Sequence, residues 1–254
     1  MARSKKSAIA IEALTTEQQF RDAVALQKTI WGFDEIELVP VRLFVVATKV
    51  GGQAFGGYSE GRLVAFCLAL PGLKPGPRSF LHSQMLGVLP EYRDAGIGRL
   101  LKLRQREDAL ARGIDLIEWT FDPLEIKNAY FNMERLGAIV RRYVRNQYGT
   151  TTSHLHGGLP TDRCTAEWWV ASERVRSVVK GEPCENLPIV ERIDVPANIG
   201  EIRRTDPKRA RAIQAQIADR FEAAFDRRLA VVGVDRSTEA GTYLLADAGT
   251  GDIK

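Results

Sequence analysis

The decisive stretch of this chain reads Leu86-Gly87-Val88-Leu89-Pro90-Glu91-Tyr92-Arg93-Asp94-Ala95-Gly96-Ile97-Gly98. Its apolar first half continues a run that begins at residue 80, which predicts a buried strand over residues 80–88. Pro90 ends this strand because proline has no N–H to donate to a ladder. The glycines then predict a turn, and leucines at helical spacing predict an amphipathic helix over residues 99–111, with Leu100, Leu103 and Leu110 near one face.

The turn between this strand and this helix has the residues of an anion-binding site. Gly96 and Gly98 lack a Cβ, so the backbone can take left-handed angles and approach a ligand closely. Free N–H groups of the turn and the positive end of the helix dipole favour a pyrophosphate. A plain connecting turn is the other reading of this pattern. Leu101 stands where a dinucleotide fingerprint needs its third glycine, and the GK[ST] of a P-loop is absent.

The flanking elements predict a sheet with helices packed on it. A loop is expected over residues 71–77, which are rich in proline and glycine, and a helix over 125–136. The other core strands are expected at 53–58, 62–70, 114–121 and 138–144. The order strand, turn, helix, strand, helix, strand is typical of an α/β or α+β architecture.

The N-terminal part predicts two further helices. Thr15 and Gln18 fit a capping box, with Thr15 as the N-cap of the first helix. The second is expected over residues 41–50, where Gly51 ends it. Residues 1–7 are basic and are expected to be disordered.

After residue 148 the pattern changes and predicts an extra C-terminal α+β subdomain. A polar loop over residues 150–163 contains His154 and His156, and a long helix is expected over 207–227. Further strands are expected at 167–170, 187–195, 229–234 and 242–246. The predicted domains are a disordered start (1–7), a core (8–148) and an extension that completes the sheet and adds the subdomain (149–254).

Composition excludes several classes of protein. The chain has 254 residues, 44% hydrophobic and 27% charged, which is typical of a soluble globular protein. It has no apolar run of roughly 18 residues and no signal-peptide pattern, so a cytoplasmic location without membrane contact is expected. Three widely spaced cysteines indicate neither a disulfide framework nor a metal site. The net charge of +4 is scattered without a nucleic-acid motif, so no nucleic acid partner is expected, although it suits an anionic cofactor.

Two motifs together resemble the GNAT superfamily, the GCN5-related N-acetyltransferases. Residues 86–101 are similar to its acyl-CoA-binding motif, a strand ending Val-x-Pro and then Arg/Gln-x-x-Gly-x-Gly/Ala at the start of a helix. Residues 128–137 are similar to its second signature, a helix with Asn near its start and Leu-Gly at its end. The resemblance covers residues 8–148, and its specific motifs lie within 80–138.

The resemblance implies a fold and a reaction. The fold is a central mixed, mostly antiparallel sheet flanked by helices. The reaction is acyl transfer from acetyl-CoA or another acyl-CoA directly to an amine of a small molecule or peptide, without a metal. Superfamily members are often dimers, so a homodimer is left open. A non-catalytic acyl-CoA-binding protein with a partner-binding tail is the alternative, and the acceptor is not identified.

The resemblance also implies a cofactor site. Asn128 would hydrogen-bond the pantetheine arm or its waters, although a local helix cap is the other reading. Backbone groups of the strand would pair with the arm, and those of the turn would hold the pyrophosphate. These backbone groups belong to Leu86, Gly87, Val88, Arg93, Asp94, Ala95, Gly96, Ile97, Gly98 and Arg99.

Three residues are candidates for the proton transfers. His82 lies six residues before Val88, where some superfamily members carry a catalytic glutamate, and its reference pKa of ~6.5 suits a base. Glu118 on the following strand is a second candidate base. The superfamily's usual tyrosine acid is replaced by Met133, so Tyr130 is the candidate acid. Structural roles are the alternative for all three.

Overall fold

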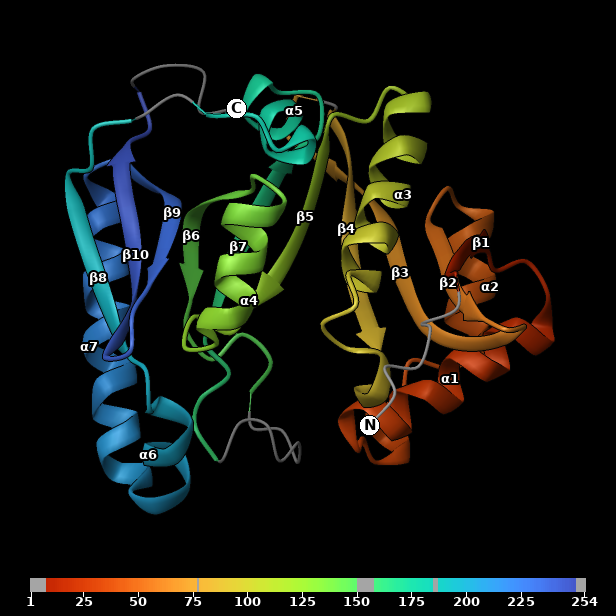
Figure 1. Ribbon diagram of the computed structural model, residues 1–254, viewed down its shortest axis with the longest axis horizontal. Helices are drawn as coiled ribbons and strands as arrows, with labels where there is room; N and C mark the ends of the chain where they lie inside the picture. The colour runs from red at the N-terminus through yellow and green to blue at the C-terminus, as the bar shows by residue number, and fades with distance from the viewer. Residues whose placement is uncertain (1–7, 77, 150–157, 185–186, 250–254) are drawn as a thin grey trace. The chain divides into compact units, whose positions relative to one another are not determined.

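The computed structural model describes residues 8–76, 78–149, 158–184 and 187–249. The expected disordered start and the two loop histidines, His154 and His156, lie outside the described residues. The chain divides into two compact units, Met1–Ile117 and Glu118–Lys254 (Figure 1). The domain boundary expected after residue 148 stays a prediction.

The first unit is an antiparallel sheet with three helices. Its strands are β1 (Ala10–Ala13), β2 (Gln53–Ser59), β3 (Arg62–Lys74) and β4 (Arg78–Val88), in that spatial order. Its helices are α1 (Glu17–Trp31), α2 (Val41–Lys49) and α3 (Ile97–Ala111), with short 3₁₀ turns η1 (Glu35–Glu37) and η2 (Pro90–Tyr92). The expected capping box exists one residue later than predicted, with Thr16 as N-cap and Gln19 as its partner. Aromatic rings join two of the helices to the sheet, since Phe44 of α2 contacts both Phe20 of α1 and Phe66 of β3.

Strand β3 runs further than the sequence predicts. The expected loop at 71–77 is wrong for residues 71–74, which pair with β4, including Pro71 opposite Leu81. Strand β2 begins at Gln53, opposite Ala69, so its pairing with β3 does not extend to residues 71–74, which pair with β4. Proline is tolerated there because an edge position needs no second hydrogen bond.

Helix α3 buries a different face from the predicted one. Leu100 and Leu110 are exposed, whereas Ile97, Leu101 and Ala109 are buried. Two polar residues, Lys102 and Gln105, share the buried face. The predicted face was wrong because the prediction placed only leucines in the core, whereas two polar side chains of this helix are buried.

The second unit contains the remaining strands. Their spatial order is β5 (Leu116–Phe121), β7 (Arg163–Trp169), β6 (Ile139–Val144), β9 (Leu229–Arg236), β10 (Ala240–Asp247) and β8 (Glu191–Pro196). Strand β5 spans the division between the units. Its helices are α4 (Ile126–Tyr130), which continues as a π-helical turn η3 (Phe131–Arg135), α5 (Glu173–Lys180), α6 (Ile199–Thr205) and α7 (Pro207–Asp226). The predicted fold class, a largely antiparallel open sheet flanked by helices, is confirmed.

Aromatic residues fill the core of the second unit. Trp168 is fully buried against Trp119, and its Nε1 donates to the Leu136 carbonyl at 2.7 Å. Trp169 on the opposite face of β7 is buried too, so both tryptophans pack into the protein. Phe221 of α7 packs on Tyr143 of β6 and Tyr243 of β10, which fixes α7 on the sheet. Burying these rings is the main stabilising contribution here.

None of the helices that the structure describes has the length and apolar character needed to cross a membrane.

Candidate functional site

The turn before α3 has two residues in the left-handed region. Asp94 has φ of 60° and Gly96, the N-cap of the helix, has φ of 82°. Aspartate is among the residues that tolerate this region. The first N–H groups of a helix have no acceptor inside it, and a glycine cap offers no side chain to them. The start of α3 therefore presents donors suited to an external anion.

Gly96 and Gly98 both have space for a Cβ, but only one of them needs glycine for its backbone angle. At Gly96 the positive φ itself favours glycine, and a Cβ there would meet nothing within 4 Å. Gly98 has no positive φ, and its Cβ would meet only Leu86 Cδ2, at 3.5 Å. Neither backbone angle nor packing requires glycine at 98, so its missing side chain leaves room for a ligand.

The other predicted cofactor residues differ in what they can offer. Ile97 is buried and anchors the helix start, so only its N–H is available to a ligand. A Cβ on Gly87 would lie 2.7 Å from the Trp31 ring, so Gly87 is required by the packing of α1. Arg93 donates through Nε to the carbonyl of Val88 at 3.3 Å, which ties the turn to the end of β4.

Strand β4 contains a bulge next to the candidate base. Ser83 pairs with Ala69 and Met85 pairs with Leu68, so Gln84 has no residue opposite it on β3. An extra residue disrupts the alternation of side chains along a strand. His82 lies just before this bulge, half-buried and opposite Leu70.

A buried polar cluster that the sequence did not predict lies beside the bulge. Lys102 donates from Nζ to Ser83 Oγ at 2.8 Å, and Ser83 donates to Gln105 Oε1 at 3.1 Å. Burial lowers the pKa of Lys102 to about 7. Burial also raises the pKa of the neighbouring Cys67 thiol to about 12, so this cysteine stays protonated. The signal available in the sequence was the i, i+3 spacing of Lys102 and Gln105 among leucines.

In the second unit, Glu118 is a buried and paired carboxylate. Its Oε2 lies 3.5 Å from Nη2 of Arg142, whose Nε donates to Thr165 Oγ1 at 3.3 Å. The side chain of Arg142 is half exposed, so the pair connects the buried Glu118 to solvent. This is the environment of the second candidate base.

Helix α4 carries the other two candidates. Asn128 is exposed, and its backbone N–H donates to the Glu125 carbonyl at 2.9 Å. Tyr130 is half-buried, with the guanidinium carbon of Arg236 4.0 Å from its ring centroid, a cation–π geometry. Met133, at the position of the usual tyrosine, is fully buried.

The π-helical turn adds a residue that the sequence analysis missed. Asn132 is buried and accepts from Trp119 Nε1 at 3.3 Å. Its Nδ2 is buried and makes no hydrogen bond with the part of the chain that is described. Single π-helical turns are frequent at functional sites.

No group of three or more His, Cys, Asp or Glu residues in the described part of the chain could hold a metal ion.

Comparison with solved structures assigns the fold. No model of a protein family and no curated protein matches the sequence. The ribosomal-protein-S18-alanine N-acetyltransferase of Escherichia coli matches in three dimensions with a TM-score of 0.52 and 18% identity, over 65% of this chain and 97% of that one. The chain has the GNAT acetyltransferase fold.

Two further structures agree. Arabidopsis thaliana Naa50, in complex with the bisubstrate analogue CoA-Ac-MVNAL, has a TM-score of 0.50 and 14% identity, over 63% of this chain and 97% of that one. Salmonella typhimurium yncA, with its cofactor acetyl-CoA, has a TM-score of 0.52 and 14% identity, over 66% and 96%. The GNAT structures are covered almost completely, so part of this chain has no counterpart in them.

Proposed function

We propose that this protein is an acyl-CoA-dependent N-acyltransferase that passes the acyl group, with acetyl as the first choice, directly to an amine. The observation that carries the proposal is the turn before α3. Its left-handed Gly96 and its open Gly98 stand at a helix N-terminus in a GNAT fold. A pyrophosphate is the ligand that such a turn suits best.

The cofactor would contact the chain mainly through backbone groups. Residues 94–99 would donate N–H groups to the pyrophosphate, since the Arg93 N–H already donates to the Pro90 carbonyl at 3.2 Å. Residues 86–88 would offer the edge of β4 to the pantetheine arm. Gly87 can contribute only main-chain atoms, because the space of its missing side chain is filled by Trp31. Asn128, exposed on α4, would hydrogen-bond the arm.

The reaction requires one proton to leave the amine. The nitrogen then forms an amide bond with the acyl carbon, the carbon–sulfur bond breaks, and the thiolate leaves and takes up a proton. His82 is the first candidate to accept the amine's proton, because an imidazole titrates near neutral pH. Glu118 is the second, and its carboxylate is buried beside Arg142.

The leaving group needs little help. Met133 is buried and cannot donate a proton, and the Tyr130 ring is covered by Arg236. A thiolate is a tolerable leaving group, since the reference pKa of a thiol is only about 8.5. Substitution of Tyr130 by phenylalanine should therefore lower kcat less than substitution of the base.

Turnover with a panel of amines tests the proposal. We expect thiol release from acetyl-CoA that depends on an added amine, and a loss of 10²-fold or more, roughly, in kcat for His82→Ala or Glu118→Gln. Wild-type turnover in both variants would contradict the assigned bases. Acetyl-CoA binding without turnover on any amine would instead support the non-catalytic alternative.

A further inference from the structure

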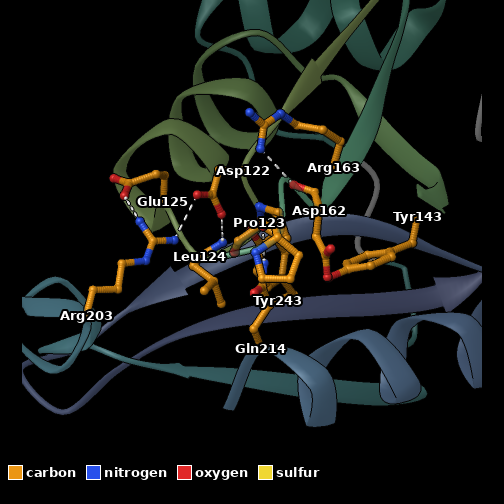
Figure 2. A network of polar contacts seen from close by, with 11 residues as sticks. Asp122, Pro123, Leu124, Glu125, Tyr143, Asp162, Arg163, Arg203, Gln214 and Tyr243 are labelled. Carbon is orange, nitrogen blue, oxygen red and sulfur yellow. Dashed lines mark hydrogen bonds and ion pairs between the residues drawn. The ribbon is translucent and has the colours of Figure 1, made fainter. Parts of the chain in front are cut away.

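The segment from Asp122 to Glu134 follows β5 and contains α4 and most of the π-helical turn. It carries Asn128 and Tyr130, the two α4 residues of the proposed site. Residues from α6, β9 and β10, all far along the chain, contact this segment at several points. Figure 2 shows the part of this network around Asp122, Glu125 and Arg203.

Arg203 of α6 is the centre of these contacts. It is buried, and its Nη2 lies 2.8 Å from Asp122 Oδ2 while its Nη1 lies 2.9 Å from Glu125 Oε1 (Figure 2). Asp122 is itself nearly buried, whereas the side chain of Glu125 is 55% exposed. One guanidinium therefore joins two carboxylates that flank the start of α4.

These two carboxylates belong to the turn that begins the helix. Asp122 Oδ1 accepts the Leu124 N–H at 2.8 Å, and its carbonyl accepts the Glu125 N–H at 3.0 Å. Glu125 is the N-cap of α4, and its carbonyl accepts the N–H groups of Asn128 and Ala129. The orientation of Glu125 therefore sets the first turn of α4.

Strands β9 and β10 hold the rest of the segment. The Tyr243 hydroxyl donates to the Pro123 carbonyl at 2.6 Å (Figure 2). Gly241 leaves room for Ile126, because a Cβ there would lie 2.3 Å from Ile126 Cγ2. The Val234 N–H donates to Glu134 Oε1 at 2.9 Å. Each contact restrains a different part of the segment.

The geometry of Arg203 is specific to arginine. Two of its nitrogens serve two different carboxylates, which a single ammonium reaches less well. Its Nε is buried and makes no hydrogen bond with the described residues. Its Nη1 and Nη2 are the atoms that bind the two carboxylates. The neighbouring Arg204 is exposed and donates to the Gly200 carbonyl of its own helix.

We propose that Arg203 is a positioning residue for acyl-CoA binding, which acts through Asp122 and Glu125 to hold α4 and its Asn128 in place. The C-terminal elements of this chain would then form part of the binding machinery, although they touch no reacting atom. This inference rests on the proposed function.

Hydrogen–deuterium exchange together with kinetics tests the inference. In Arg203→Met we expect amides 126–134 to exchange faster on the order of tenfold while the strands of unit 2 keep their protection. We expect the KM for acetyl-CoA to rise about tenfold and kcat to fall less than about threefold. Arg203→Lys should recover part of both effects, and Arg204→Met is the matched control that should show neither.

Two results would overturn the proposal. The first is an Arg203→Met protein that behaves like Arg204→Met in exchange and in KM. The second is uniform loss of protection throughout unit 2, which would mean that Arg203 only stabilises the fold. If Arg203→Met does not fold, Glu125→Gln removes the exposed half of the network and is expected to give a smaller change of the same kind.

The exchange measurement separates this proposal from the proposed function. If wild type binds no acyl-CoA, the assignment of the reaction fails and the claim on KM fails with it. Local exchange in residues 126–134 still shows whether Arg203 holds α4. If wild type binds acetyl-CoA and Arg203→Met keeps its KM, only the inference about Arg203 fails.

Discussion

Lys102 is a lysine whose side chain is buried in the first unit. Burial lowers its pKa from 10.5 to about 7, so the folded protein releases a proton that the unfolded chain keeps until near pH 10.5. The unfolded state binds more protons in this window, so the free energy of unfolding rises with pH between about 7 and 10.5. Below about pH 7 the buried lysine is charged, so the free energy of unfolding is lowered by the full cost of burying that charge. Cys67 stays neutral through most of the window because its pKa is about 12.

Lys102→Met is therefore expected to flatten the pH dependence of stability. The slope of unfolding free energy against pH should fall by up to about 1.4 kcal/mol per pH unit between pH 7 and 9. Urea denaturation at several pH values measures this slope. Lys49→Met removes an exposed lysine of the same unit and should leave the slope unchanged. An unaltered slope in Lys102→Met would contradict the buried charge.

Gly98→Gln is expected to separate binding from stability. The added Cβ meets only Leu86 at 3.5 Å, and glutamine is a better helix former than glycine, so the protein should be about as stable as wild type. The long side chain would obstruct the proposed pyrophosphate, so acetyl-CoA affinity should fall at least tenfold, roughly, whereas Gly98→Ala should keep it because the motif accepts alanine. Thermal unfolding and calorimetry measure the two effects. Unchanged affinity in Gly98→Gln would place the ligand elsewhere.

Sequence alone predicted the glycine turn before α3, while the ligand of that turn stays a prediction. The turn was found because a helix start with left-handed backbone has a local signature. Ser83, Lys102 and Gln105 were missed because their cluster depends on which face of α3 meets β4. Arg203 was missed because its partners are about eighty residues away in the chain.

At the scale of elements, β10 packs against α4 too closely for any side chain at Gly241. Gly241→Ala should destabilise the protein by about 1–3 kcal/mol, because the new Cβ would overlap Ile126. Ile126→Ala removes the two closest atoms, Cγ2 and Cγ1, and leaves Cβ at 2.8 Å, so the double variant should be more stable than the sum of the single changes predicts. Urea denaturation of the four proteins gives the coupling energy. Additive effects would show that β10 and α4 do not press on each other.

Most elements were predicted, and the misses have physical reasons. The strand over 80–88 and the long helix α7 have strong local patterns. Strand β3 was cut short because Pro71 suggested a loop, whereas its position beyond the end of β2 makes proline acceptable. Helices α5 and α6 were missed because each is short, with 8 and 7 residues, too few for a helical repeat of apolar residues to stand out.

At the scale of the whole molecule, the chain has a GNAT-type fold and further residues. The Escherichia coli structure is covered to 97%, whereas this chain is covered to 65%, so part of this chain has no counterpart in it. Helix α6 and strands β9 and β10 supply the contacts that hold residues 122–134. The C-terminal elements therefore restrain the segment that contains α4 as well as extending the sheet.

Calorimetric titration with acetyl-CoA and desulfo-CoA tests the central claim most directly. Wild type is compared with Gly96→Trp at the start of α3 and with Gly113→Trp just beyond its other end. Both glycines have positive φ, 82° and 70°, and neither has an atom within 4 Å of an added Cβ, so the strain is matched. Micromolar binding that is lost in Gly96→Trp and kept in Gly113→Trp is the predicted result. Absence of binding in wild type, or equal binding in all three proteins, would contradict an acyl-CoA site at this turn.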